Sequence, residues 1–215
     1  MKIQKINKDV ASKIISNKHY SKRLGIFWEG FGLFIEDKIV GVVSYGQPSA
    51  PTQKYAFKNR DFRLYELTRL VVDRDIKNGA SYLISHSLKM LSSQPASIIS
   101  FSDLAHGHSG IVYQATNWTY TGSTVSHDCL YKVNEELIHP MTLRDKLGIK
   151  DPKRWAKENN IEIIKPKPKH RYFYFVGNKK QKKEMISKLN YKIIQPYPKS
   201  DKITYDDGLN CSNYV

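Results

Sequence analysis

The segment Ser102–Gly122, with the sequence SDLAHGHSGIVYQATNWTYTG, contains two residues that could carry acid–base chemistry. Asp103 follows a short apolar run, and a carboxylate at the end of a buried strand could accept a hydrogen bond from an amine or remove its proton. Tyr113 lies in a stretch that reads as a short helix, and its hydroxyl could protonate a leaving group. The alternatives are a loop-capping role for Asp103 and a core aromatic role for Tyr113.

Two histidines in the same segment raise the question of a metal site. His106 and His108, together with Asp103, are a chemically acceptable ligand set. Their spacing is loose, and histidines in a glycine-containing loop are often plain loop residues. The sequence therefore predicts no bound metal.

Further candidates lie earlier in the chain. His19 and Tyr20 follow a predicted helix; the histidine could titrate or form hydrogen bonds near neutral pH, and the tyrosine could stack on a base. The alternative for His19 is a helix-terminal residue favoured by the dipole. Glu66 could be a base and Arg69 could bind phosphate, or either could be a strand-edge charge. Because they are three residues apart on a strand, they are predicted to point to opposite faces.

A third group surrounds the start of a helix in the stretch RDIKNGASYL. A helix that opens on Gly79 and Ala80 exposes backbone N–H groups, which bind phosphate well. Ser81, in the first turns, could touch a phosphate of the donor. The alternatives are an ordinary helix start and a small packing residue.

These residues need elements that position them, and the hydrophobic pattern supplies a strand–helix–strand order. It predicts a central strand over Arg63–Val72, a helix beginning at Gly79, and a buried strand over Ala96–Asp103. A short helix and a further strand follow. Crossover connections of this kind predict an α/β fold with a partly parallel sheet.

The flanking segments have their own signals. Before the central strand we expect a short strand, a helix with Asn7 as N-cap, and a hairpin with a tight turn at Asp37-Lys38. After the buried strand and its helix we expect a hairpin and two short helices, capped by Thr142 and Asp151.

Charge is the strongest global property of the chain. It has 215 residues and a formal net charge of +15, which favours a polyanion as partner over compositional drift. The segment KPKPKHRYF combines this charge with aromatic residues, so a nucleic-acid contact is predicted there, with Tyr20 as a further stacking residue. The alternative is a solubilising linker. The predicted contact residues of the segment are Lys165, Lys167, Lys169, His170 and Arg171.

The helix-opening turn and the order of elements resemble the GNAT superfamily of N-acetyltransferases. That superfamily has a turn patterned R/Q-x-x-G-x-G/A, into which Arg74–Gly79 falls, with Lys77 in place of the first glycine. The resemblance implies a mixed sheet with a splayed parallel centre, flanked by helices. It also implies donor-binding residues, which are Arg69, Arg74, Lys77, Gly79, Ala80 and Ser81.

A closer resemblance is to the Mom-type phage DNA-modification proteins, over roughly residues 17–176. It is carried by the ordered motifs HYS, ELTRL, NGASYLISHSLK, SFSDLAHGHSGIVYQATNWTYTG and PKPKHRYFYF. It implies an enzyme that attaches a glycine-derived amide group to adenine N6 and so protects DNA from restriction. The catalytic residues it implies are Asp103, Tyr113, His19 and Glu66.

We therefore expect one GNAT-like domain over residues 1–196, with a basic DNA-facing insertion at about 125–169, and a partly mobile tail over 197–215. The partner is DNA, with the target adenine flipped out of the stack. No apolar run is long enough to span a membrane, and two cysteines suit a reducing host cytoplasm.

The sequence leaves two possible donors and three possible classes of function. The departure at Lys77 and the high charge favour glycyl-tRNA as donor, and an acyl-CoA-like donor is the other possibility. A rival function is an acetyl-CoA-dependent N-acetyltransferase that acts on a protein or a small amine. A third is a non-catalytic nucleic-acid-binding module with a GNAT-like fold.

Overall fold

A computed structural model describes residues 1–104, 107–124, 129–138, 140–165 and 167–199. The chain divides into two compact units, and the boundary passes through three strands. Unit 1 comprises Met1–Phe101, Gly110–Gly122 and Arg171–Tyr197, and unit 2 comprises the rest. Most of the predicted tail, residues 200–215, lies outside the described residues. No described helix is long and apolar enough to cross a membrane.

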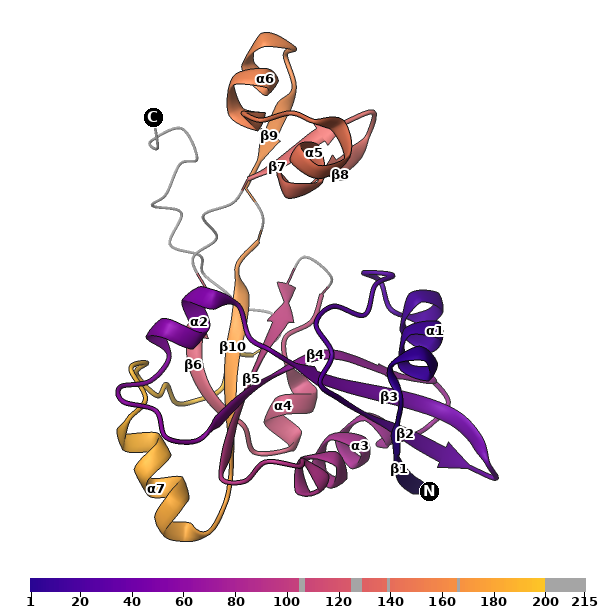
Figure 1. The fold of residues 1–215 in the computed structure, drawn as a ribbon, viewed down its shortest axis with the longest axis vertical. Helices are drawn as coiled ribbons and strands as arrows, with labels where there is room; N and C mark the ends of the chain where they lie inside the picture. Colours follow the sequence, from indigo (N-terminus) through magenta and orange to yellow (C-terminus); the bar gives the residue numbers. More distant parts are fainter. Residues whose placement is uncertain (105–106, 125–128, 139, 166, 200–215) are drawn as a thin grey trace. The chain divides into compact units, whose positions relative to one another are not determined.

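In the described part of the chain, seven strands form one mixed sheet in the order β1-β2-β3-β4-β5-β10-β6 (Figure 1). Neighbours from β1 to β4 are antiparallel, whereas β4 and β5 are parallel. The predicted mixed α/β class with a parallel centre is confirmed. The strand bounds are β1 Lys2–Ile6, β2 Glu29–Ile35, β3 Lys38–Gly46, β4 Arg63–Val72, β5 Ala96–Asp103, β6 Thr119–Ser123 and β10 Lys169–Val176.

The β4–β5 pair is joined along only part of its length. The parallel register runs from Arg63 opposite Ala96 to Glu66 opposite Ile99. Beyond that point β4 continues to Val72 in pairing with β3, and β5 continues to Asp103. The two central strands therefore separate at their carboxyl ends.

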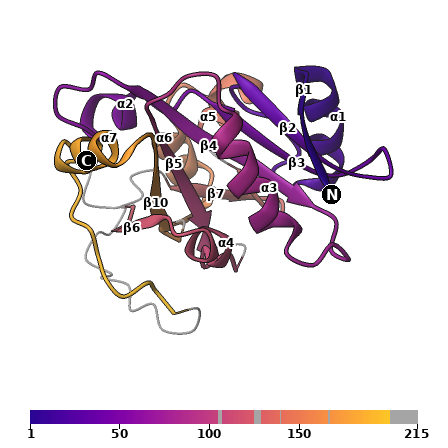
Figure 2. The same cartoon turned by 90° about the horizontal axis from the view of Figure 1, so that it is seen from below.

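Helices cover both faces of this sheet (Figures 1 and 2). On one face, α3 (Gly79–Ser87), its 3₁₀ extension Leu88–Met90 and α4 (Ile111–Ala115) enclose the largest core. On the other face, α1 (Lys8–Lys18) packs near β2 and β3, and α7 (Lys179–Ser187) packs near β5 and β10. The alternation of strand residues explains this division, since Val42 faces α1 while Val43 faces α3.

The predicted N-cap of α1 is confirmed, whereas the predicted position of the hairpin turn is wrong. The Asn7 side chain accepts a hydrogen bond from the Val10 backbone N–H, as an N-cap should. The hairpin turn was predicted at Asp37-Lys38, but the two residues with positive φ are Glu36 and Asp37. Lys38 begins β3, so the turn lies one residue earlier than predicted.

A short helix, α2 (Ala50–Tyr55), was missed because Pro48 and Pro51 were read as closing the preceding hairpin. Pro51 lies in its first turn, where a missing N–H costs no hydrogen bond. Its C-terminal side joins the end of α7 through backbone hydrogen bonds from Lys58 to Lys188 and from Asn190 to Ala56.

Unit 2 has a small sheet of its own, in the order β8-β7-β9. Its core contains Tyr131, Leu143 and Ala156. The predicted cap Asp151 is confirmed, because its carboxylate accepts the N–H groups of Lys153 and Arg154. Thr142 is not a cap, since its helix starts earlier, at Pro140. The bounds are β7 Leu130–Val133, β8 Glu136–Ile138, β9 Glu162–Ile164, α5 Pro140–Leu147 and α6 Pro152–Glu158.

Candidate active site

A hydroxyl network occupies the place where β4 and β5 separate in unit 1. The Ser100 Oγ lies 3.0 Å from the carbonyl oxygen of Leu67 and 2.8 Å from the Tyr113 hydroxyl. Ser100 follows the last paired residue of β5, so its side chain occupies the opening between the strands. Tyr113 comes from α4, which packs on the same face of the sheet. The network therefore connects β4, β5 and α4.

The surroundings of Tyr113 keep its hydroxyl protonated. The ring lies 5.0 Å from that of Trp118 and 5.2 Å from that of Tyr172, and the residue is only 7% exposed. Burial raises the pKa of Tyr113 to about 12, although the hydrogen bond with Ser100 lowers it. A phenol with this pKa is a proton donor at neutral pH.

Gly110 fixes the start of α4 and thereby the place of Tyr113. It has a φ of +83° and its carbonyl accepts the N–H groups of Tyr113 and Gln114. A Cβ at this position would lie 2.5 Å from the Tyr172 ring. The Tyr172 hydroxyl in turn accepts a hydrogen bond from the Gln114 side chain at 3.2 Å. Close approach and backbone conformation both require glycine here.

The start of α3 has the glycine expected of a donor-binding turn. A Cβ on Gly79 would lie 2.7 Å from Ile76 and 2.8 Å from Val72, so this glycine lets the turn pack on the end of β4. The Ser81 hydroxyl donates to the Asn78 carbonyl at 3.0 Å, which gives it a local role in the turn. Ala80 is half-buried, and Arg74 and Lys77 are exposed to solvent.

A β-bulge overturns one prediction about Glu66 and Arg69. Tyr45 lies opposite Leu67 and Ser44 lies opposite Arg69. Thr68 is thus the extra residue in the register, although its hydroxyl bonds to Ser44 of β3. It reverses the alternation, and Leu67 and Leu70 consequently face the same core. Glu66 and Arg69 therefore share a face, and the negative charge of Glu66 acts on the pKa of Arg69.

Arg69 is tied to the loop after α1. Its Nε donates to the carbonyl of Arg23 at 2.8 Å, and its Nη1 donates to the carbonyl of Thr68 at 2.6 Å. Burial lowers its pKa, and the nearby charge of Arg23 adds to that effect. The geometry gives Arg69 a positioning role for this loop, with a cationic side chain beside Glu66.

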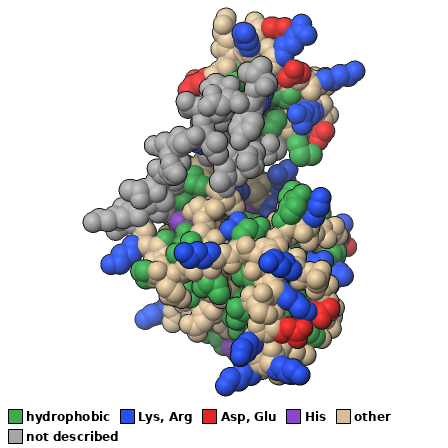
Figure 3. Space-filling view, turned by 90° about the vertical axis from the view of Figure 1, so that its left-hand side faces the viewer, with side chains coloured by type: hydrophobic (Ala, Val, Ile, Leu, Met, Phe, Trp, Pro, Cys, Tyr) green, Lys and Arg blue, Asp and Glu red, His purple; other side chains and the backbone are tan. Residues whose placement is uncertain are grey.

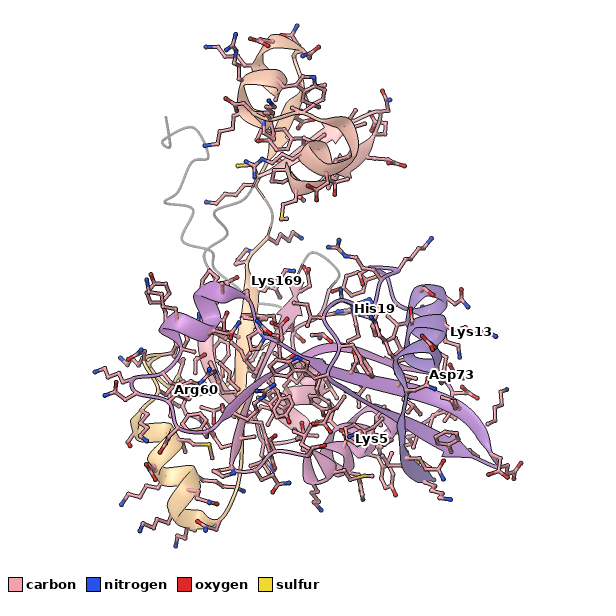
Figure 4. The ribbon with its side chains drawn as sticks, viewed as in Figure 1. Lys5, Lys13, His19, Arg60, Asp73 and Lys169 are labelled. Carbon is pink, nitrogen blue, oxygen red and sulfur yellow. The ribbon has the colours of Figure 1, made fainter. Side chains whose placement is uncertain are left out.

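His19 and Tyr20 lie in the same loop. His19 is the C-cap of α1, and its Nδ1 accepts the backbone N–H of Ser21 at 3.1 Å (Figure 4). Because a backbone N–H can only donate, the neutral imidazole carries its proton on Nε2, so Nε2 is a donor in this arrangement. Tyr20 is 48% exposed, and its ring lies 4.2 Å from that of His19.

Asp103 is described with unit 2. It ends β5, and its Oδ2 lies 3.0 Å from the Lys169 Nζ. Its backbone carbonyl accepts the N–H of His108, which shapes the following loop. His106 lies outside the described residues. Among the residues that are described, no three His, Cys, Asp or Glu side chains gather in a group that could hold a metal.

The basic segment divides into exposed and internal side chains. Lys165, Lys167 and Lys169 are exposed. His170 is 1% exposed, its Nδ1 lies 3.1 Å from the Ser123 hydroxyl, and burial lowers its pKa. In unit 1, Arg171 donates to the Thr121 carbonyl at 2.8 Å and stacks over a tyrosine ring. Lys165 and Lys167 are therefore the members of this segment best placed to meet phosphate, because Lys169 is paired with Asp103.

Ser100, Gly110 and Tyr172 were missed by the sequence reasoning. Ser100 is one of several serines in a strand that was read only as buried and apolar. Gly110 was read as part of a loop, and Tyr172 as part of a β-forming run. Their shared signal is that all three lie within the motifs on which the family resemblance rests, although none of them has an obvious acid–base role.

The splayed mixed sheet, with a hydroxyl network at its opening, defines a mixed α/β protein with a candidate acid–base site. The chain belongs to the Mom protein family, whose model matches residues 1–199. It is 30% identical over 207 residues to the methylcarbamoylase Mom of Escherichia phage Mu, covering 93% of this chain and 84% of the relative.

Solved structures give only a distant likeness. The aminoglycoside 6'-N-acetyltransferase of Enterococcus faecium is 12% identical, with a TM-score of 0.48 over 83% of this chain and 99% of that one. An aminoglycoside 6'-N-acetyltransferase complexed with coenzyme A is 14% identical, with a TM-score of 0.42 over the same shares. The family assignment rests on the sequence relationships alone.

Proposed function

We propose that this protein is a transferase that adds a glycine-derived group, of the carbamoylmethyl type, to N6 of adenine in phage DNA, and so protects that DNA from restriction. The observation that carries the proposal is the 30% identity to the phage Mu methylcarbamoylase over nearly the whole chain. The hydroxyl network at the opening of the sheet supports it, because it supplies a protonated acid where the central strands part.

The acceptor sets the first chemical demand. The N6 lone pair of adenine is delocalised into the ring, so a transferase must orient the amine and remove a proton. We assign this role to Asp103, whose side chain is only 12% exposed and is paired with Lys169. The ion pair restrains the orientation of the carboxylate.

The leaving group sets the second demand. As the bond from N6 to the transferred group forms, the bond from that group to the donor breaks, at the ester oxygen of a glycyl-tRNA or the sulfur of an acyl-CoA. We assign the protonation of this departing atom to Tyr113. The Ser100 hydroxyl carries one proton and lies between the Leu67 carbonyl and the Tyr113 oxygen. When Tyr113 gives up its proton, rotation of the Ser100 hydroxyl lets it donate to the resulting phenolate. The raised pKa of Tyr113 matches the role of an acid that is reprotonated after each turnover.

The donor would bind at the start of α3. Exposed Arg74 and Lys77 supply positive charge beside the helix terminus, and the backbone of Ala80 and Ser81 belongs to its first turn. Both a glycyl-tRNA and an acyl-CoA-like donor carry phosphates that suit this turn. Arg69 and Glu66, held on one face by the bulge, would position the loop of His19 and Tyr20.

DNA would be bound by lysines and by base stacking. Exposed Lys165 and Lys167 would neutralise phosphates, and exposed Tyr20 would stack on the flipped adenine. His19, which presents Nε2–H, would donate a hydrogen bond rather than act as a base.

Mass spectrometry of nucleosides tests this function. DNA from cells that express the full chain should contain a new adenosine species with the added composition of one glycine residue. Asp103→Asn should abolish the species, whereas Asp145→Asn, an exposed charge change in α5, should leave it. Absence of the species from wild-type samples would refute the proposal.

A reconstituted reaction separates the donors. Purified protein and DNA should modify adenine only when the true donor is added. Activity that survives ribonuclease treatment of the extract would exclude glycyl-tRNA, and activity that is lost would exclude a free acyl-CoA.

A further inference from the structure

Unit 1 has a polar hollow at the end of the β4–β5 pair opposite to the place where these strands separate. Its volume is about 550 Å³, and its lining comes from the start of β4 and from the loop before β5. Arg60 and Arg63 line it together with the loop Ser92–Pro95. None of the roles proposed above uses this hollow.

The hollow is positively charged. Burial lowers the pKa of Arg60, and the nearby charge of Arg63 lowers it further, so the two guanidinium groups are close enough to repel each other. Asp61 is the only acidic residue among the described lining residues, and its carboxylate pairs with Lys188 at 2.8 Å. The two arginines therefore retain an uncompensated charge that a bound anion would stabilise.

Arg63 is held in place without being neutralised. Its guanidinium lies 3.8 Å from the centre of the Trp28 ring. Stacking on an aromatic face orders the planar group, and the donors at its edge remain suited to a bidentate oxyanion. This arrangement is typical of a phosphate-binding arginine.

A second hollow continues the first. It has a volume of about 450 Å³, shares Gln94 and Pro95 with the first, and adds Lys89 and Lys182. It also includes Asn178, the N-cap of α7. The face that carries α7 displays several Lys and Arg side chains (Figure 3). Two adjoining basic hollows suit a ligand with repeated anionic groups.

We propose that these hollows bind the phosphodiester backbone of DNA, as a contact surface separate from the residues that carry out the chemistry. The inference rests on the proposed function for the choice of DNA as the polymer. Successive phosphates along one strand would occupy the Arg60–Arg63 hollow and its neighbour. Such contacts position a duplex without reading its sequence.

The salt dependence of DNA binding tests the surface. Duplex binding by the purified full chain is followed by fluorescence anisotropy from 0.05 to 0.3 M salt (roughly the range in which phosphate contacts dominate). Loss of two phosphate contacts in Arg60→Gln/Arg63→Gln should reduce the slope of log K against log salt by about 1.8. At 0.1 M salt this corresponds to roughly tenfold to sixtyfold weaker binding.

A matched control removes the same charge elsewhere on unit 1. Lys13 and Lys38 are exposed, and Figure 4 shows Lys13 on the opposite side of that view from Arg60. Lys13→Gln/Lys38→Gln should keep the wild-type slope. Equal slopes for the two double variants, or an unchanged slope in the arginine variant, would overturn the proposal. If Arg63→Gln disturbs folding, Arg60→Gln alone should still lower the slope by about 0.9.

Two further measurements distinguish a DNA-backbone surface from a nucleotide site and from the reaction itself. Calorimetry with coenzyme A tests a nucleotide phosphate as ligand; if the arginine variant loses coenzyme A binding but keeps the DNA slope, the proposal is wrong. Binding is measured without turnover. A reduced slope in a protein that yields no modified adenine would therefore support the surface while refuting the proposed function.

Discussion

Replacing Gly110 with alanine tests whether α4 is held where the structure places it. The new Cβ would lie 2.5 Å from Tyr172 Cε2 and 2.7 Å from its hydroxyl oxygen. A left-handed backbone costs a non-glycine residue roughly 1–2 kcal/mol. Displacement of a buried ring adds roughly 1–3 kcal/mol, as overpacking does elsewhere. We expect the free energy of unfolding to decrease by roughly 2–5 kcal/mol. Each kcal/mol lost should lower the melting temperature by about 2–4 °C.

Gly107→Ala is the matched control. Gly107 has a similar φ of +71°, but among the described residues, its own chain neighbours aside, no atom lies within 4 Å of the position that its Cβ would take. It should carry only the backbone cost, so the difference between the variants, roughly 1–3 kcal/mol, isolates the contact with Tyr172. Thermal and urea unfolding followed by circular dichroism measure both. Equal destabilisation of the two variants would refute the packing of Gly110 against Tyr172.

The remaining predictions concern the chemistry and its pH dependence. Tyr113→Phe should lower the modification rate by roughly 10²–10⁴-fold, with Tyr55→Phe, at an exposed tyrosine, as the control; a rate within twofold of wild type would remove Tyr113 from the reaction. Ser100→Ala should lower the rate less, because it removes only the stabilisation of the phenolate. Burial raises the pKa of Tyr113 from about 10 in unfolded chains to about 12. The stability that this shift contributes to the folded state is complete below the unfolded pKa and is lost as the pH rises through the folded pKa. The urea midpoint of unfolding should therefore decrease as the pH is raised from about 10 to about 12, and it should decrease less steeply in Tyr113→Phe.

Local signals sufficed for most elements. The bounds of β4 and β5 match the predicted strands, because the alternating, β-rich pattern of β4 and the short apolar run of β5 can be recognised without knowledge of their neighbours. The caps Asn7 and Asp151 were found for the same reason, since a cap bonds only to N–H groups two or three residues away. α2 was missed because a proline signals both a turn and a first helical turn, and only packing against the segment after α7 decides between them.

Site geometry could not be obtained in this way. The sequence predicted opposite faces for Glu66 and Arg69, and a bulge opposite β3 reversed this, because register depends on two strands and not on one. The hydrogen bond between Ser100 and Tyr113 depends on two tertiary features, the separation of β5 from β4 and the packing of α4 on the sheet.

The sequence by itself determined the fold class, the strands and helices that carry the site, and the family, since these follow from periodicity, caps and ordered motifs. Only the tertiary structure decided which side chains share a face, which hydroxyls meet and which arginines are already occupied. Arg171 has the same charge in the sequence as Arg60, yet Arg171 is bonded to Thr121 while Arg60 lines an open hollow. The physical reason is that hydrogen bonding and burial depend on residues far apart in the chain, and these fix the state of each charged or hydroxyl group.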